Sequence, residues 1–221
     1  MEQDRDCITL SKILKFADLK DKEVLEIGCG DGRITTQLIG RAKRVVAIDP
    51  DAAIIAEAKK NTKGAGLHIG SGENLEFPSE SFDVILFTLS LHHQNSSMAL
   101  REANRVLKDH GRVVILEPVN DGELEQVCNF FHDEAQALQK AFQAIEASDF
   151  EVERSEVFYT YWEFENEHEL YEWLFTYYQK PFDNSLVVLI GEFLGNKAKS
   201  LPIILQDKII IVSLRKYSTQ G

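Results

Sequence analysis

Residues 24–38 read VLEIGCGDGRITTQL, in which three alternate glycines stand between an apolar run and a helical pattern. The apolar run predicts a buried strand, and the spacing of Ile34 and Leu38 predicts the helix that follows. A strand that leads through such a loop into a helix presents backbone N–H groups and a positive helix end to a ligand. The stretch therefore predicts an α/β fold with a ligand site at the end of this strand.

The spacing of the glycines separates two classes of nucleotide site. A dinucleotide fingerprint reads G-x-G-x-x-G, and its third glycine allows the helix to pack closely on the strand. Here Gly28, Gly30 and Gly32 alternate, and Arg33 stands where that third glycine is needed. Glu26 precedes the loop, where it would repel a pyrophosphate and attract an ammonium group. A nicotinamide dehydrogenase is therefore disfavoured, and the loop predicts a ligand with an amino group and no phosphate.

Apolar runs alternate with helical spacing through the first 117 residues. This order needs crossover connections, which place the strands parallel in one buried sheet. The predicted strands are EVLEI (23–27), RVVAI (44–48), LHIG (67–70), FDVILF (82–87) and GRVVILE (111–117). One short helix is expected before them, around residues 8–16.

The pattern changes after residue 117. Residues 122–148 predict one long helix or two shorter ones, and a strand-like stretch follows at 150–164. An aromatic-rich helix halted by Pro181 and one further helix precede a last strand at 208–216. We expect one domain (1–221) with a cofactor-binding core (10–118), acceptor-side helices and an aromatic-rich insertion (119–205), and the last strand (207–216).

The net charge of −12 is unevenly distributed along the chain. Residues 117–172 hold 16 acidic residues against two basic ones, Lys140 and Arg154. A phosphate backbone would be repelled by this segment, so nucleic acid is an unfavourable partner and a small neutral or cationic molecule is preferred. A solvated acidic face without functional meaning is the alternative.

Targeting and redox features are few. No apolar run approaches the roughly 20 residues that span a bilayer, and the charged start MEQDRDCITL is unlike a signal peptide. Cys7, Cys29 and Cys128 are far apart in the sequence, which favours reduced thiols over disulfides or a zinc site. We therefore expect a cytoplasmic protein without a membrane partner or a metal, and leave its oligomeric state open.

Five segments in a fixed order carry a family resemblance. They are VLEIGCGDGR, VVAIDPD, GSGENLEFPSESFDVIL, LHH and EANRVLKDHGRVVILEPV. Together they resemble the class I S-adenosylmethionine-dependent methyltransferases, and within them the common small-molecule type (methyltransferase type 11). The resemblance covers about residues 10–120. It implies a Rossmann-like, mostly parallel seven-stranded sheet with an antiparallel last strand, and S-adenosylmethionine as cofactor with S-adenosylhomocysteine as product.

The glycine loop gains specific roles from this resemblance. It implies that Glu26 and the backbone of Gly28 and Gly30 receive the methionine end of the cofactor. Cys29, between two glycines, is counted with the cofactor-binding residues and is expected to be a small packed residue rather than a nucleophile.

The resemblance implies that residues at the ends of the next two strands bind the ribose and the adenine of the cofactor. Asp49 ends the second strand, where its two oxygens can accept hydrogen bonds from both ribose hydroxyls. Pro50 is expected to begin the following helix and to line the same site. The adenine is expected against Ser71, Gly72 and Glu73. Ser71 stands where the family commonly has an aspartate, so either its hydroxyl or the Glu73 carboxylate takes the adenine amino group.

The residues after the fourth strand indicate which classes of methyl acceptor are unlikely. Enzymes that methylate planar nitrogens carry a D/N-P-P-Y/F motif there, and cytosine C5 enzymes carry a Pro-Cys pair. This chain has Thr88 and Leu89 at the start of that segment, which we expect to line the cofactor. A small-molecule acceptor is therefore favoured over a base in nucleic acid.

Three residues are candidates for catalysis. His92 and His93 could act as a base near neutral pH, and His93 is also expected to contact the cofactor or the substrate. Glu117 ends the fifth strand on the same edge of the sheet and could act as base, hold a cationic acceptor or cap the next loop.

The acceptor side is expected to be closed by the insertion, which would form a lid. Its aromatic residues could bind a cation through ring faces, although most of them are expected to pack the insertion onto the sheet. Other hypotheses are a protein side chain or a metalloid as acceptor, and a non-catalytic module that binds the cofactor or its product.

Overall fold

The computed structural model describes residues 1–217, which fall into two compact units. Among the described residues, the core unit comprises residues 10–117, 137–156 and 210–217. The insertion unit comprises residues 1–9, 118–136 and 157–209.

The core unit is built on five parallel strands. They are β2 (Glu23–Ile27), β3 (Arg44–Asp49), β4 (Gly66–Ile69), β5 (Phe82–Thr88) and β6 (Leu107–Pro118). β2 lies between β3 and β5, so that Ile27 is opposite Ile48 on one side and opposite Phe87 on the other. The carboxyl ends of the central strands therefore meet at one edge of the sheet, where open α/β sheets bind their ligands.

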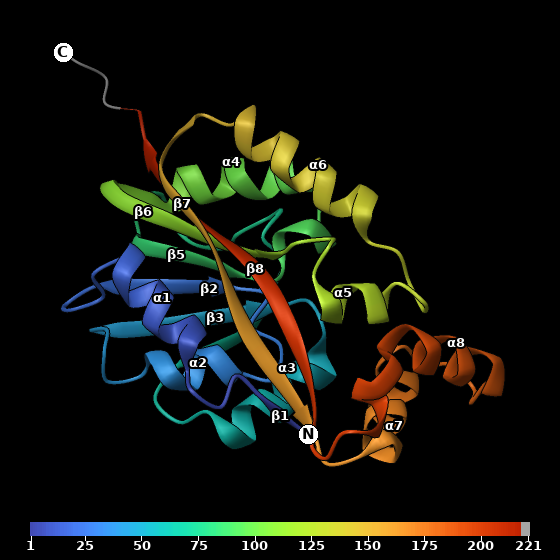
Figure 1. The fold of residues 1–221 in the computed structure, drawn as a ribbon. Coiled ribbons are helices and arrows are strands. Elements are labelled where there is room, and N and C mark those ends of the chain that lie inside the picture. Colours follow the sequence, from blue (N-terminus) through green and yellow to red (C-terminus); the bar gives the residue numbers. More distant parts are fainter. Residues whose placement is uncertain (218–221) are drawn as a thin grey trace. The chain divides into compact units, whose positions relative to one another are not determined.

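Within residues 1–217 the sheet has eight strands in the order β1-β7-β8-β6-β5-β2-β3-β4. Figure 1 shows these strands. The remaining strands are β1 (Glu2–Gln3), β7 (Phe150–Phe164) and β8 (Ile203–Lys216). The predicted α/β fold, mostly parallel with an antiparallel last strand, is confirmed, since β8 runs opposite to β7. The sheet has one strand more than expected because β1 is two residues long and leaves no sequence pattern. β8 also begins four residues before the predicted residue 207.

Helices cover both faces of the sheet in the core unit. Figure 1 shows α4 (Ser96–Val106) and α6 (Ala135–Glu146) on one face, and α1 (Ile8–Phe16), α2 (Arg33–Leu38) and α3 (Ala52–Asn61) on the other. Successive strand residues point to opposite faces. Accordingly, Ile48 belongs to a buried cluster with Ala103 of α4, while its neighbour Ala47 packs with Ala58 of α3.

The insertion unit has its own helices and apolar cluster. Its helices are α5 (Glu123–Cys128), α7 (Glu167–Tyr177), α8 (Asn184–Leu194) and the 3₁₀-helix η2 (Gly195–Lys199). Residues 122–148 therefore form two helices, α5 and α6, and α7 ends before Pro181 as predicted. The cluster combines residues of α5, α7 and α8, such as Val127, Leu174 and Ile190, each fully buried. Among the residues described, no helix is both long and apolar enough to cross a bilayer.

Candidate cofactor and active site

The glycine loop between β2 and α2 has the backbone conformation that its glycines allow. Gly28, Gly30 and Gly32 have φ angles of +75°, +54° and +85°, in the left-handed region that other residues adopt only with strain. A Cβ at Gly28 would lie 2.3 Å from the Ser90 Cβ, whereas a Cβ at Gly30 would meet nothing within 4 Å. The loop is therefore closely packed at Gly28 and open at Gly30, where a ligand can approach the backbone.

Four N–H groups of this loop bond within the protein. The N–H groups of Gly28 and Cys29 donate to the Ile48 carbonyl at 2.8 and 3.0 Å, and that of Gly30 donates to Asp49 Oδ2 at 3.0 Å. The N–H of Gly32 donates to the Cys29 carbonyl at 3.1 Å. The expectation that the loop presents these N–H groups to a ligand is therefore wrong. A site that keeps its N–H groups occupied is poor for a phosphate, in agreement with the exclusion of a dinucleotide.

Asp49 connects the loop to the start of the next helix. Its Oδ2 accepts from the Gly30 N–H and its Oδ1 accepts from the Asp51 N–H, each at 3.0 Å. The side chain is buried but 9% of Asp49 remains exposed. A carboxylate offers about four lone-pair sites, so each oxygen can accept one further hydrogen bond. This geometry fits a carboxylate that is already oriented for the two hydroxyls of a ribose.

Glu26 has a different environment, although it stands on the neighbouring strand. It is 0% exposed, and its two oxygens accept hydrogen bonds from the hydroxyls of Thr35 (2.5 Å) and Thr88 (2.8 Å). Burial raises the pKa of Glu26 to about 7, against the lowering effect of the two hydroxyls and of nearby Arg33. In this conformation both carboxylate oxygens of Glu26 are occupied by the two threonine hydroxyls that it orients.

Pro50 and Cys29 take packed positions beside Asp49. α3 begins at Ala52 rather than at Pro50, because the Asp51 side chain caps it by accepting from the N–H groups of Ala53 (2.7 Å) and Ile54 (3.2 Å). The prediction that Pro50 starts this helix is wrong, since an acid at the next position makes the better cap. Cys29 is 6% exposed and burial raises the pKa of its thiol to about 12. A buried thiol of this kind is a packing residue.

The segment after β4 is held by contacts that fix Ser71 and Glu73. The Ser71 hydroxyl accepts from the Glu73 N–H at 3.3 Å, and a Glu73 carboxylate oxygen accepts from the N–H of Asn95. A Cβ at Gly72 would lie 2.4 Å from Gln94 Oε1. Gly72 is therefore needed for the close approach of Gln94, and the Glu73 carboxylate already has a backbone partner. Ser71 keeps the hydroxyl hydrogen as a donor.

The turn after β5 joins the cofactor side of the sheet to the histidines. Leu89 has a φ of +57°, a strained conformation for a leucine, and its N–H donates to the Leu116 carbonyl of β6 at 2.9 Å. The hydroxyl of the next residue, Ser90, donates to the Ile27 carbonyl at 2.5 Å. Thr88, Leu89 and Ser90 therefore tie the ends of three adjacent strands together.

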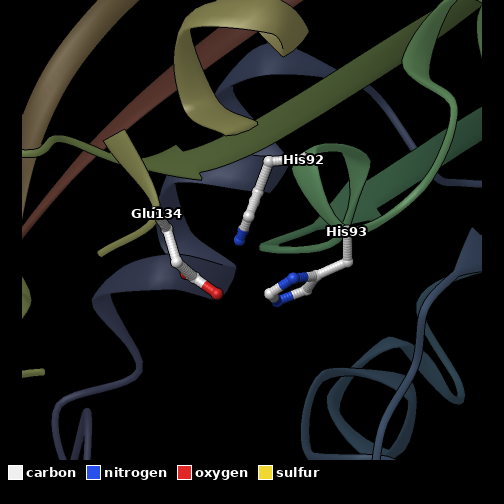
Figure 2. Close-up of side chains that lie close together, drawn as sticks. All are labelled: His92, His93 and Glu134. Carbon is white, nitrogen blue, oxygen red and sulfur yellow. The ribbon is translucent and has the colours of Figure 1, made fainter. Parts of the chain in front are cut away.

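His92 and Glu117 form a buried pair. His92 and His93 are neighbours on the 3₁₀-helix η1 (Leu91–His93), and Figure 2 shows their side chains close together. Their ring centroids are 3.8 Å apart. His92 Nδ1 contacts Glu117 Oε2, and Glu117 Oε1 accepts from the Leu91 N–H at 2.8 Å. Glu117 is 0% exposed and His92 is buried, whereas His93 is exposed. The structure thus brings two of the three predicted catalytic residues into direct contact.

Sequence reasoning missed three residues that shape this site. Thr35 holds Glu26, Ser90 packs against Gly28, and the Gln94 amide donates to the Ser90 carbonyl at 3.1 Å. Each of these residues contacts a partner at least four positions away in the sequence. Polar residues of the same types also occur in many surface helices, so residue type alone does not mark a site. No sequence pattern marks them.

Comparison with known proteins finds a match within the core unit. Residues 25–115 match the family model described as "Methyltransferase domain". An uncharacterized methyltransferase of Schizosaccharomyces pombe is 37% identical over 101 residues, which are 42% of this chain and 38% of that protein. The chain thus spans less than two thirds of that relative's length.

Solved structures extend the likeness over the fold. The YcgJ protein of Bacillus subtilis superposes with a TM-score of 0.66 at 19% identity, over 95% of this chain and 98% of that one. The [4+2]-cyclase SpnF has a TM-score of 0.63 at 16% identity, over 95% of this chain and 80% of that one. Residues 25–115 are thus similar to the methyltransferase domain family, and the chain has the fold of these solved structures.

Proposed function

We propose that the protein binds S-adenosylmethionine and transfers its methyl group to a small-molecule acceptor by in-line displacement. The observation that carries this proposal is Asp49, which is pre-oriented by two backbone N–H groups beside the open face of the glycine loop. When bound, the cofactor supplies a methyl group on a sulfonium, so the protein's main tasks are alignment and removal of a proton from the acceptor. The methyltransferase domain over residues 25–115 supports the same reading.

The fold alone does not decide the reaction, because a [4+2]-cyclase has the same fold. A module that only bound the cofactor would need Asp49 and the loop but no base. The His92–Glu117 pair supports catalysis, since a buried carboxylate at Nδ1 fixes the imidazole and stabilises its protonated form. Proton exchange with an acceptor then takes place at Nε2, with Glu117 as the positioning residue.

The acceptor is proposed to be small and neutral or cationic. The insertion unit supports this, because Trp162 and Trp173 lie 4.9 Å apart and Tyr177 stacks on Trp173 at 5.5 Å, within an acidic segment. Ring faces and carboxylates together attract ammonium groups. A metalloid acceptor has less support, since Cys29 and Cys128 belong to different units and burial raises the pKa of each thiol to about 12.

Calorimetric titration tests the cofactor. The purified protein would be titrated with S-adenosylmethionine, S-adenosylhomocysteine and NAD, and the same ligands would be added to Asp49→Ala. We expect micromolar binding of the first two and its loss in the variant. Binding of NAD instead, or of no ligand, would overturn the proposal.

Steady-state kinetics tests the proposed base, once screening of small amines, phenols and thiols has given an acceptor. His92→Gln and Glu117→Gln should lower kcat by about 10²–10⁴, with S-adenosylhomocysteine affinity unchanged. Full activity of His92→Gln would exclude His92 as the base.

A further inference from the structure

The core unit has a cleft of about 480 Å³ on the α1 face of its sheet, a volume typical of small-molecule sites. The cleft is lined by the end of α1, by the two residues that follow it and by the neighbouring strands β7, β8 and β6. All of these lining residues belong to the core unit. Arg112 of β6 lines the cleft and precedes Glu117 by five positions, which is about 16 Å along a strand. The cleft is therefore separate from the His92–Glu117 pair.

The floor of the cleft follows from the alternation of side chains along the strands. Successive residues of a strand point to opposite faces, so Val113 packs in the buried cluster with α4 while Arg112 lines the cleft. Ser213 lies on β8, between β6 and β7, and is 1% exposed. The cleft begins where α1 ends, at Phe16. A short side chain on the central strand, beyond the end of the covering helix, leaves this part of the sheet hollow.

Two guanidinium groups on the walls of the cleft are held in place by the protein. Arg112 donates to the Glu153 carboxylate from Nε and Nη2 at 2.7 and 2.8 Å, and the Ser213 hydroxyl donates to the same carboxylate at 3.3 Å. The guanidinium carbon of Arg154 lies 4.2 Å from the centroid of the Phe16 ring. These contacts orient both groups before a ligand arrives, which reduces the entropy that binding costs.

Donors on the walls remain available for a ligand. A guanidinium carries five N–H donors, and Arg112 Nη1 has no hydrogen-bond partner within residues 1–217. The exposed Lys15 ammonium has no hydrogen bond or ion pair to any of the residues described. Both carboxylates of the lining already have partners, since Glu153 is held by Arg112 and Asp18 Oδ1 accepts from the Lys20 N–H at 3.0 Å. The free hydrogen-bonding groups of the walls are therefore mainly cationic donors.

The charge of the surrounding unit permits an anion to approach. The lining of the cleft holds three basic and two acidic residues. Within residues 1–217 the core unit holds 19 basic and 20 acidic residues, whereas the insertion unit holds 5 and 16. The acidic excess of the chain therefore lies in the insertion unit, and the cleft is a locally positive place on a nearly neutral unit. Such a cleft attracts anions.

We propose that this cleft is a second ligand site, which binds a small organic anion. A carboxylate or phosphate of the ligand would bind Arg112 and Lys15, and its apolar body would lie against Phe16 and Ala17, which are both buried. A guanidinium matches the geometry of either anionic group, and an ammonium adds a compact positive charge. The site is independent of the proposed methyl transfer, and it disfavours the cationic molecules proposed as methyl acceptors.

Two probes of similar shape and opposite charge test this site. Benzoate and benzamidine would be titrated into the ¹⁵N-labelled chain, and the amide chemical shifts would be followed by NMR. We expect benzoate to shift the amides of Phe16, Ala17 and Ser213 with a dissociation constant in about the millimolar range, and benzamidine to leave them in place. Phenyl phosphate should act like benzoate, and inorganic phosphate, which has no apolar body, should bind at least about threefold more weakly than phenyl phosphate.

Two substitutions should change the benzoate affinity in opposite directions. Lys15→Ala removes a cation of the wall and should weaken benzoate about two- to fivefold. Asp18→Asn removes a negative charge of the lining and should strengthen benzoate about twofold. Lys59→Ala is the matched control, because Lys59 is also an exposed lysine in the last turn of a helix but lies outside the cleft. It should leave the affinity unchanged. The spectrum of each free variant checks that its fold is intact.

The outcomes decide the proposal. Selective binding of benzoate or phenyl phosphate at the three amides supports it, and the tighter of the two identifies the anionic group that the cleft prefers. Equal shifts with benzamidine, or no shift of these amides with either anion, would overturn it. Equal losses of affinity in Lys15→Ala and Lys59→Ala, or equal binding of inorganic phosphate and phenyl phosphate, would overturn it as well.

Discussion

Asp49 and Glu26 lie at the ends of two neighbouring parallel strands, and their surroundings differ in kind. Asp49 accepts from backbone N–H groups and stays 9% exposed, whereas Glu26 accepts from two hydroxyls and is fully enclosed. Burial raises the pKa of Glu26 to about 7. An acid at a strand end can thus present its oxygens to a ligand or can organise its neighbours, and the partners of its oxygens decide which.

The largest expected effect is the loss of cofactor binding in Asp49→Ala. Two charge-assisted hydrogen bonds to a ligand are together worth about 4 kcal/mol, or roughly a thousandfold in affinity. Calorimetry with S-adenosylhomocysteine measures it. Asp51→Ala is the matched control, because it removes only the α3 cap and should cost about 1 kcal/mol of stability with affinity unchanged. Similar affinities of the two variants would contradict the assignment of Asp49.

Gly28→Ala tests the packed end of the glycine loop, which follows β2 and donates hydrogen bonds to Ile48 and Asp49 of β3. The added Cβ would meet the Ser90 Cβ at 2.3 Å and adopt a positive φ, so we expect a loss of about 3 kcal/mol in the free energy of unfolding. Urea denaturation measures it. Gly30→Ala, which faces open space, should lose only about 1 kcal/mol. Adding Ser90→Gly to Gly28→Ala should recover the part caused by the collision; no recovery would show that the backbone conformation alone matters.

The pKa of Glu26 predicts a pH-dependent stability. The folded pKa of about 7 exceeds the ordinary value of 4.5, so the folded state holds a proton that the unfolded state releases. The contribution of Glu26 is therefore fully present below about pH 4.5 and falls as pH rises through 7, by at most about 3 kcal/mol. Urea denaturation at pH 5, 6, 7 and 8 should show that Glu26→Gln gains stability relative to the wild type as pH rises. A pH-independent difference would contradict the raised pKa.

The smallest expected effect is at Cys29. Because its thiol is buried with a raised pKa, alkylation by iodoacetamide at pH 8 should modify exposed Cys7 and spare Cys29 and Cys128. Peptide mass spectrometry measures the modification of each residue. Cys29→Ala should bind S-adenosylhomocysteine within about twofold of the wild type, and a large loss would make the sulfur a binding group.

Local patterns predicted the elements of the core unit well. β2 and α1 have the predicted bounds, and β5 extends the prediction by one residue, because buried parallel strands are continuous apolar runs bounded by turns. β1 and the early start of β8 were missed because their pairing partners lie far away in the sequence. The start of α3 was misplaced because Asp51, rather than Pro50, caps it.

The sequence by itself determined the fold class, the family resemblance and the identity of the residues at the strand ends, since these depend on periodicity and on residue type at fixed spacing. The tertiary structure alone decided their environments. It enclosed Glu26 with Thr35 and Thr88, paired His92 with Glu117, and left the buried Nη1 of Arg33 without a partner among the residues described. Burial and hydrogen bonding arise from contacts between distant segments, and these contacts set the pKa and the accessibility of each group.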